Sequence, residues 1–111
     1  MTKTVAQMVQ EIFEKVNQDN KVSTVTNMDF KLTVYEKTLT IDIWMDNVLY
    51  RICKFVLTDG VVTHIAWSPF VSDTKIVALA YVYIMAGEEK YQEWVDRNML
   101  SIVDTEWDIN I

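Results

Sequence analysis

The side chains with the clearest chemical potential are the only cysteine, Cys53, and the only histidine, His64. A two-residue loop in the hairpin that contains them would place His64 opposite Phe55, with Cys53 diagonal to His64 and about 7 Å away between backbones. A thiol beside an imidazole is the pairing of a cysteine nucleophile. No Asn or Asp on that face obviously orients the imidazole, however, and no oxyanion site is evident. We therefore expect two ordinary sheet residues and no catalytic residue.

The acidic side chains form groups that could serve in acid–base catalysis or metal binding. Acid–base catalysis needs two carboxyls in different environments, one of them partly dry, whereas these groups lie in charge-rich segments that favour a solvated surface. A calcium loop needs alternating Asp or Asn, a turn glycine and a closing Glu. Segment 104–108 has the alternation alone. We therefore predict no metal and no cofactor. The groups are Glu88 with Glu89, Glu93 with Asp96, and Asp104 with Glu106 and Asp108.

The composition removes further classes of function. The chain has 111 residues, 50% of them hydrophobic, which suits one folded domain over residues 1–111. Its two glycines lie 27 residues apart and cannot build a phosphate-cradling loop. The net charge of −6 argues against direct contact with a nucleic-acid backbone. The longest apolar run, 76–86, is too short for a membrane span. Because no secretory signal is evident either, we expect a cytoplasmic protein.

Hydrophobic periodicity predicts an α+β fold in the order helix, sheet, helix. Thr4 and Gln7 fit a capping box at the start of the first helix. Asp59-Gly60 is the strongest hairpin signal, and Gly87 marks a kink or a close-packing point in the last helix. The expected elements are a helix over 4–18, a four-stranded antiparallel meander with strands at 30–35, 39–45, 48–57 and 61–67, a long helix beginning at Ser72 or Asp73, and an extended arm over 105–111.

Two-residue loops between these strands fix registers that collect most apolar side chains on one face of the sheet. Both helices should cover this face. Lys54 and Thr63 are exceptions, because the same registers place two polar side chains there. The expected core residues of the face include Leu32, Ile41, Ile43, Ile52 and Ile65.

The opposite face of the sheet has two characters. Lys31, Asp42 and Arg51 form a row of alternating charge across three strands, as on a solvent-exposed surface. The rest of the face is too apolar for an ordinary wet surface, and exposed apolar patches mark contacts. It is therefore a candidate dimer or client face. Its residues are Tyr35, Trp44, Leu49, Phe55 and Val62.

The negative charge is concentrated near the end of the chain. Residues 88–111 hold seven acidic and two basic side chains, a net charge of −5, whereas residues 1–87 contribute −1. Glu89, Glu93 and Asp96 share one helix face, where like charges repel one another. A basic partner would explain this arrangement through electrostatic steering; a purely solubilising surface is the other explanation. The candidate partner-binding residues are Glu89, Glu93, Asp96, Asp104, Glu106 and Asp108.

In size, acidity and helix–sheet–helix order, the chain is similar to small phage-encoded inhibitors of bacterial defence, such as anti-CRISPR and anti-restriction proteins. This resemblance implies a non-enzymatic protein that binds a larger, basic protein, with carboxylates standing in for the phosphates of a nucleic acid. It implies neither direct nucleic-acid binding nor membrane binding.

Two other functions fit the same sequence. A dimeric acidic chaperone or immunity-type protein would bind a dedicated client through the apolar sheet face, so both a monomer and a homodimer stay open. A small-ligand-binding domain would need a cavity with convergent polar groups between helix and sheet. The expected core face offers little for such a cavity beyond Tyr50, Lys54 and Thr63.

Overall fold

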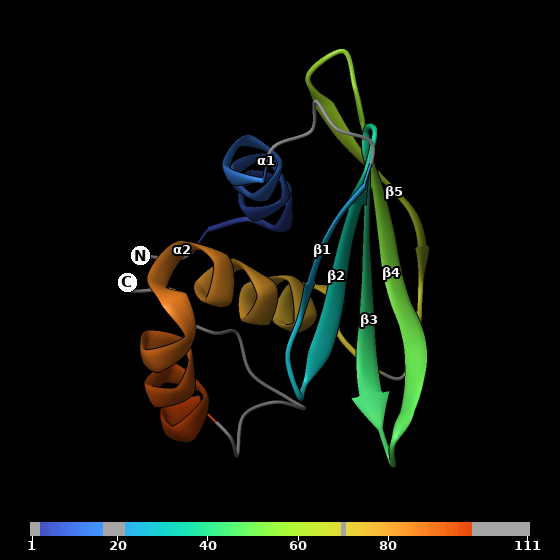
Figure 1. The fold of residues 1–111 in the computed structure, drawn as a ribbon. Coiled ribbons are helices and arrows are strands. Elements are labelled where there is room, and N and C mark those ends of the chain that lie inside the picture. The colour runs from blue at the N-terminus through green and yellow to red at the C-terminus, as the bar shows by residue number, and fades with distance from the viewer. Residues whose placement is uncertain (1–2, 17–21, 70, 99–111) are drawn as a thin grey trace.

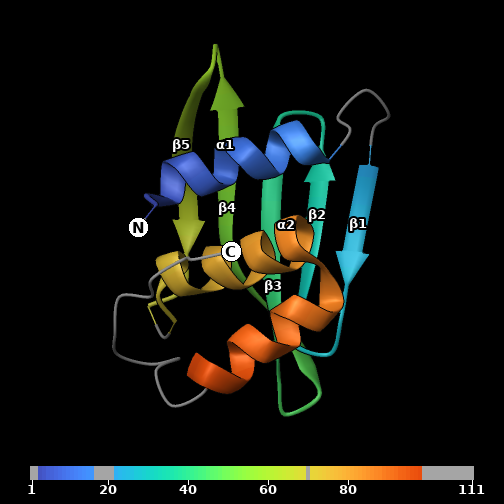
Figure 2. The ribbon, with the colours of Figure 1, turned by 90° about the vertical axis from the view of Figure 1, so that its left-hand side faces the viewer.

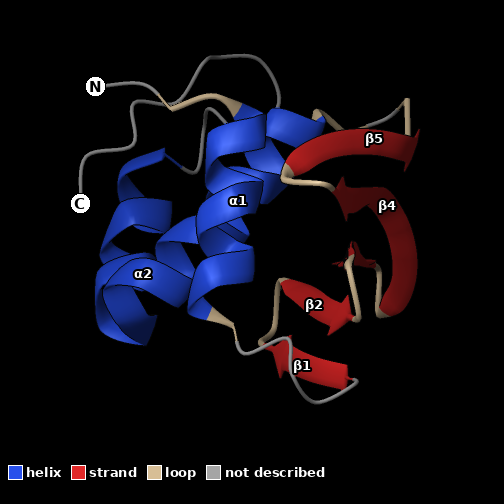
Figure 3. Ribbon diagram, turned by 90° about the horizontal axis from the view of Figure 1, so that it is seen from above, coloured by secondary structure: helices blue, strands red, loops and turns tan. Residues whose placement is uncertain are grey.

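Two helices lie on the same side of a five-stranded antiparallel sheet (Figures 1 and 3). The computed structural model describes residues 3–16, 22–69 and 71–98. It confirms the predicted α+β class and the placement of both helices on one face. The extended arm expected over 105–111 lies outside the described residues. The elements are α1 (Val5–Lys15), β1 (Val22–Thr26), β2 (Phe30–Tyr35), β3 (Thr38–Met45), β4 (Val48–Thr58), β5 (Val61–Trp67) and α2 (Asp73–Asn98).

A fifth strand, β1, lies at the sheet edge beside β2, so the prediction of four strands is wrong. Its five residues alternate between exposed and half-buried positions, and no apolar stripe distinguishes them from a loop. Their β-branched composition is the signal that favours a strand. The order β1-β2-β3-β4-β5 confirms the predicted meander, because every strand pairs with its neighbours in sequence.

Three two-residue turns connect β2 to β5, as predicted. Both central residues have positive φ in Asp46-Asn47 (52° and 64°) and in Asp59-Gly60 (50° and 77°), as type I′ hairpin turns require. In the remaining turn, Glu36-Lys37 between β2 and β3, Glu36 has a φ of 53°. A positive φ costs a non-glycine residue conformational energy. The neighbouring strand compensates, because the Leu57 amide donates to the carbonyl of Lys37 at 2.8 Å.

The predicted registers hold from β2 into the first half of β4. Asp42 lies opposite Arg51, as expected, and its Oδ1 is 3.3 Å from the Arg51 Nε. One step further, Ile41 lies opposite Cys53 instead of Ile52. Ile52 is therefore the extra residue of a β-bulge. Because side chains alternate with a period of two, the bulge moves every later side chain of β4 to the other face.

A second bulge, in β5, makes the pairing of β4 with β5 differ from the predicted register. Phe55 pairs with His64, but Lys54 pairs with Ala66, which leaves Ile65 as the extra residue. A two-residue loop at Asp59-Gly60 without a bulge predicts that Lys54 pairs with Ile65 and that Ile52 pairs with Trp67. Both expected pairings are wrong.

The bulges correct the assignment of residues to the two faces. Phe55 is 2% exposed and belongs to the core with Cys53, so its predicted place on the face away from the helices is wrong. Val62 also packs against the core. Lys54 alternates with the buried residues and lies on the outer face. Ile65, an expected core residue, is 59% exposed.

The core lies between the sheet and the two helices. Figure 2 shows α1 and the first part of α2 running across the strands. The apolar stripe of α1 is buried, and residues 76–82 of α2 are buried on all sides. The buried residues of α1 are Met8, Val9, Ile12 and Phe13.

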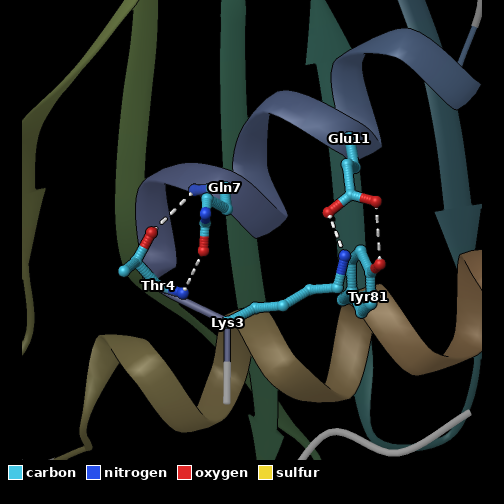
Figure 4. A network of polar contacts seen from close by, with 5 residues as sticks. All are labelled: Lys3, Thr4, Gln7, Glu11 and Tyr81. Atoms are coloured by element: carbon cyan, nitrogen blue, oxygen red, sulfur yellow. Dashed lines mark hydrogen bonds and ion pairs between the residues drawn. The ribbon is translucent and has the colours of Figure 1, made fainter. Parts of the chain in front are cut away.

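A polar network fixes α1 against α2 (Figure 4). The predicted capping box is present, because Gln7 and Thr4 each accept a hydrogen bond from the other's backbone amide. Lys3 Nζ lies 2.7 Å from Glu11 Oε2, and the Tyr81 hydroxyl donates to Glu11 Oε1 at 3.0 Å. The ammonium also lies 5.4 Å from the centroid of the Tyr81 ring. One carboxylate thus joins the N-terminal segment, α1 and α2.

Truncation of Phe55 tests the corrected assignment of side chains to the two faces of the sheet. The Phe55→Ala variant should lose about 3–5 kcal/mol of unfolding free energy, the usual cost of removing a buried aromatic ring. Tyr35→Ala, which removes a half-exposed ring from the same predicted face, should cost no more than about 1 kcal/mol. Urea denaturation measures both. Equal losses would mean that the two rings share an exposed face and that the bulge is absent.

The Lys3–Glu11 pair predicts a pH-dependent contribution to stability. The hydrogen bond from Lys3 lowers the pKa of Glu11 below its ordinary 4.5. The contribution is therefore complete above the unfolded pKa and is lost as the pH falls through the lower folded pKa. Glu11→Gln should lower the urea midpoint at pH 7, and the difference from wild type should shrink in acid. Glu14→Gln, also on α1 but outside the network, should show no such trend.

Candidate protein-binding site

Gly87 divides α2 into two helical segments, 73–86 and 88–98. Its φ of 88° and ψ of 170° lie outside the helical region, in a part of conformational space that is essentially restricted to glycine. A Cβ at this position would meet no atom within 4 Å, so the backbone conformation alone requires the glycine. The kink proposed from the sequence is confirmed, and the second segment turns back below the first (Figure 2).

The second segment is anchored on one side by aromatic residues. The Tyr91 hydroxyl donates to Asp29 Oδ2 at 2.7 Å, and its ring packs edge-to-face against Phe30 and Tyr83. Burial, and then the Asp29 carboxylate, raise the pKa of Tyr91, so the hydroxyl stays protonated as a donor. Trp94 is buried one turn further along. These contacts hold the segment against the turn between β1 and β2.

The opposite side of this segment is acidic and exposed. Glu89, Glu93 and Asp96 are all solvent-exposed, and Tyr91 and Trp94 are buried. The three acidic side chains therefore face away from the buried aromatic side of the segment. The other three candidate partner-binding residues, Asp104, Glu106 and Asp108, lie outside the described residues.

Local interactions neutralise this acidic side only in part. Lys90 Nζ lies 3.9 Å from Glu93 Oε2, with both side chains well exposed, so the ion pair contributes little. Gln92 Nε2 donates to Asp96 Oδ1 at 3.1 Å. No hydrogen bond or ion pair engages Glu89 within the described part of the chain. Residues 88–98 hold four acids and two bases, a net charge of −2. The exposed carboxylates therefore remain largely available for ion pairs with a partner protein.

An open groove of about 960 Å³ runs beside the acidic residues. Its lining combines apolar side chains with charged side chains of both signs. This combination suits an apolar anchor surrounded by ion pairs, which is the usual organisation of a protein–protein contact. The described residues that line it are Met85, Ala86, Lys90, Glu93, Trp94, Asp96 and Arg97.

The candidate apolar sheet face is smaller than expected. Tyr35 and Trp44 are exposed and Leu49 is half-buried, whereas Phe55 and Val62 belong to the helix side of the sheet. Trp44 is also constrained, because its Nε1 donates to the carbonyl of Asn27 at 3.2 Å. The five residues therefore do not form one continuous surface.

The structure places Asp73 beside His64 and buries Cys53, so the Cys53–His64 pair is not suited to nucleophilic catalysis. His64 Nδ1 lies 3.5 Å from Asp73 Oδ2, and its Nε2 donates to the carbonyl of Ala66 at 2.7 Å. An aspartate thus orients the imidazole, contrary to expectation, because the helix start brings Asp73 to the sheet. Cys53 is completely buried, and burial raises the pKa of its thiol, which opposes formation of a thiolate.

The structure also contains a buried amine that the sequence does not reveal. Lys75, in the first turn of α2, is 5% exposed, and its Nζ has no hydrogen-bond partner among residues 3–16, 22–69 and 71–98. Over residues 3–16, 22–69 and 71–98, His, Cys, Asp and Glu side chains do not form a cluster of three that could hold a metal ion. Neither α1 nor α2 is long and apolar enough, over its described residues, to cross a membrane.

Comparisons with protein-family models, with curated proteins and with solved structures find no match to this chain.

Substitution of Gly87 tests how the acidic segment is oriented. In a continuous helix, Gly→Ala stabilises by up to about 1 kcal/mol. At the observed φ and ψ, Gly87→Ala should instead destabilise by about 1–3 kcal/mol. Urea denaturation distinguishes the two signs. Glu88→Ala, at the next position and exposed, should change stability by less than about 0.5 kcal/mol. Stabilisation by Gly87→Ala would show that α2 is straight in solution.

Proposed function

We propose that this protein is a non-enzymatic binding module that occupies a basic surface of a larger protein with the acidic side of α2. The observation that carries the proposal is the exposure of Glu89, Glu93 and Asp96 on a segment whose other side is held by buried Tyr91 and Trp94. A segment fixed in this way presents its charges with little loss of conformational entropy on binding.

The spacing of the carboxylates supports a basic partner. Residues four and three positions apart on a helix are neighbours, so the carboxylates form a row of like charges that repel one another. Lys90 is the only base that lies within ion-pair distance of the row in the described segment. A surface rich in Lys and Arg would relieve the repulsion and would attract the row over a long range.

Basic surfaces of this kind are typical of proteins that bind nucleic-acid backbones. We therefore propose that the partner is a nucleic-acid-binding protein and that the bound module competes with the nucleic acid. The similarity in size, acidity and element order to phage inhibitors of bacterial defence supports the same role. An inhibitor of this type would act in the cytoplasm. The burial of Cys53 supports a role without nucleophilic catalysis.

Affinity capture with matched charge variants tests the proposal. Wild-type protein should capture a basic nucleic-acid-binding protein from lysate, identified by mass spectrometry. Glu89→Lys with Glu93→Lys should abolish capture, because the row becomes basic. Glu14→Lys with Glu36→Lys makes the same change in net charge at exposed positions outside α2 and should leave capture intact. Higher salt should weaken capture.

A competition assay then tests the mechanism. Wild-type protein should displace labelled duplex DNA or RNA from the purified partner, and the α2 variant should not. Two results would refute the proposal. One is equal capture by the α2 variant, which would make the acidic side a solubilising surface. The other is a ternary complex in which the partner holds nucleic acid and this protein together.

A further inference from the structure

The strand β5 is an outer strand of the sheet, and among the described residues only β4 pairs with it (Figures 1 and 3). Six of its seven residues are exposed. Val61 is 60% exposed and Ile65 is 59% exposed. An exposed apolar edge is a template for pairing with another strand unless charge or proline protects it. This edge has neither between Val61 and Trp67.

The hairpin turn determines which backbone groups of β5 point outward. In a two-residue hairpin, the residues that flank the turn, here Thr58 and Val61, exchange both backbone hydrogen bonds. The alternation then directs the amide and carbonyl of Thr63 toward β4. The amides and carbonyls of Val62 and His64 point away from the sheet. These two residues provide four unpaired backbone groups along one regular stretch that ends at the bulge.

We propose that a second copy of this chain pairs with β5 in antiparallel orientation, about a two-fold axis at Thr63. Val62 then lies opposite His64 of the second copy, and His64 lies opposite Val62 of the second copy. Their outward groups form four backbone hydrogen bonds. The result is a continuous ten-stranded sheet. This proposal is independent of the function proposed for α2.

The side chains complement one another in this register. Val61 lies opposite Ile65 of the second copy, so two of the most exposed aliphatic residues cover each other across the strands. On a chain with a net charge of −6, a charged interface between two copies would be repulsive. The strand β5 has no Asp, Glu, Lys or Arg. Two copies therefore meet along a strand that has no acidic side chain.

The dimer leaves the acidic side of α2 free. Tyr91 anchors that segment to Asp29, which lies between β1 and β2 near the other edge of the sheet. A single strand pair buries less area than a standard interface, so the association should depend on concentration. The dimer would carry two acidic surfaces, one from each copy.

Sedimentation velocity over a dilution series tests the proposal. The wild-type mass should rise from 13.0 kDa toward twice that value with concentration. Val61→Lys and Ile65→Glu should each remain monomeric, because each places a charge against an aliphatic side chain. The double variant V61K/I65E should dimerise again, because opposite charges then face each other across the strands. Val22→Lys, at an exposed position on the β1 edge, should dimerise like wild type. Circular dichroism checks that all variants are folded.

Several results would overturn the proposal. A wild-type mass of 13.0 kDa at every concentration would exclude the dimer. A dimer that survives Ile65→Glu, or one that Val22→Lys abolishes, would place the interface elsewhere. Failure of V61K/I65E to restore a dimer lost in both single variants would refute the register. Because the charge variants of α2 do not touch β5, capture of a partner can fail without affecting this test.

Discussion

The extra residue at Ile52 in β4 is the constraint on which the core depends. An antiparallel sheet that is covered on one side can bury only every second side chain. The strand β4, which lies between β3 and β5, has apolar residues on both sides of this alternation, and the bulge shifts the pattern by one position. It directs Cys53 and Phe55 toward the helices and Lys54 toward solvent. The packing of both helices against the centre of the sheet follows from this shift.

A second constraint acts on the helical layer. Because α2 is longer than the sheet surface it covers, a straight continuation would carry its aromatic residues away from the core. Gly87 allows the chain to turn, Tyr91 then packs against Phe30 of β2, and Trp94 becomes buried. The carboxylates on the opposite side of the same helical turns therefore face solvent. The acidic surface is thus a consequence of how the aromatic side is buried.

Local periodicity predicted the features that depend on neighbours in sequence. These include the capping box at Thr4, the hairpin turns, the pairing of Asp42 with Arg51 and the acidic row on α2. The bulges were not predicted, because no residue type identifies one. Two anomalies nevertheless pointed to the shift: a lysine on the expected core face, and apolar residues such as Phe55 on the face expected to lie away from the helices. Contacts between distant segments, such as Tyr91 with Asp29 and Asp73 with His64, depend on packing that periodicity does not encode.

The order of elements along the chain has a consequence for synthesis on the ribosome. The five strands pair with their neighbours and emerge before α2, so the sheet can form by successive local hairpins. Its helix-facing side remains uncovered until α2 has emerged, because α1 alone spans only part of it (Figure 2). During that interval the nascent sheet presents Phe30, Leu39 and Phe55 to solvent or to a chaperone. The apolar side of the sheet is therefore exposed from the time the hairpins form until α2 has packed against it.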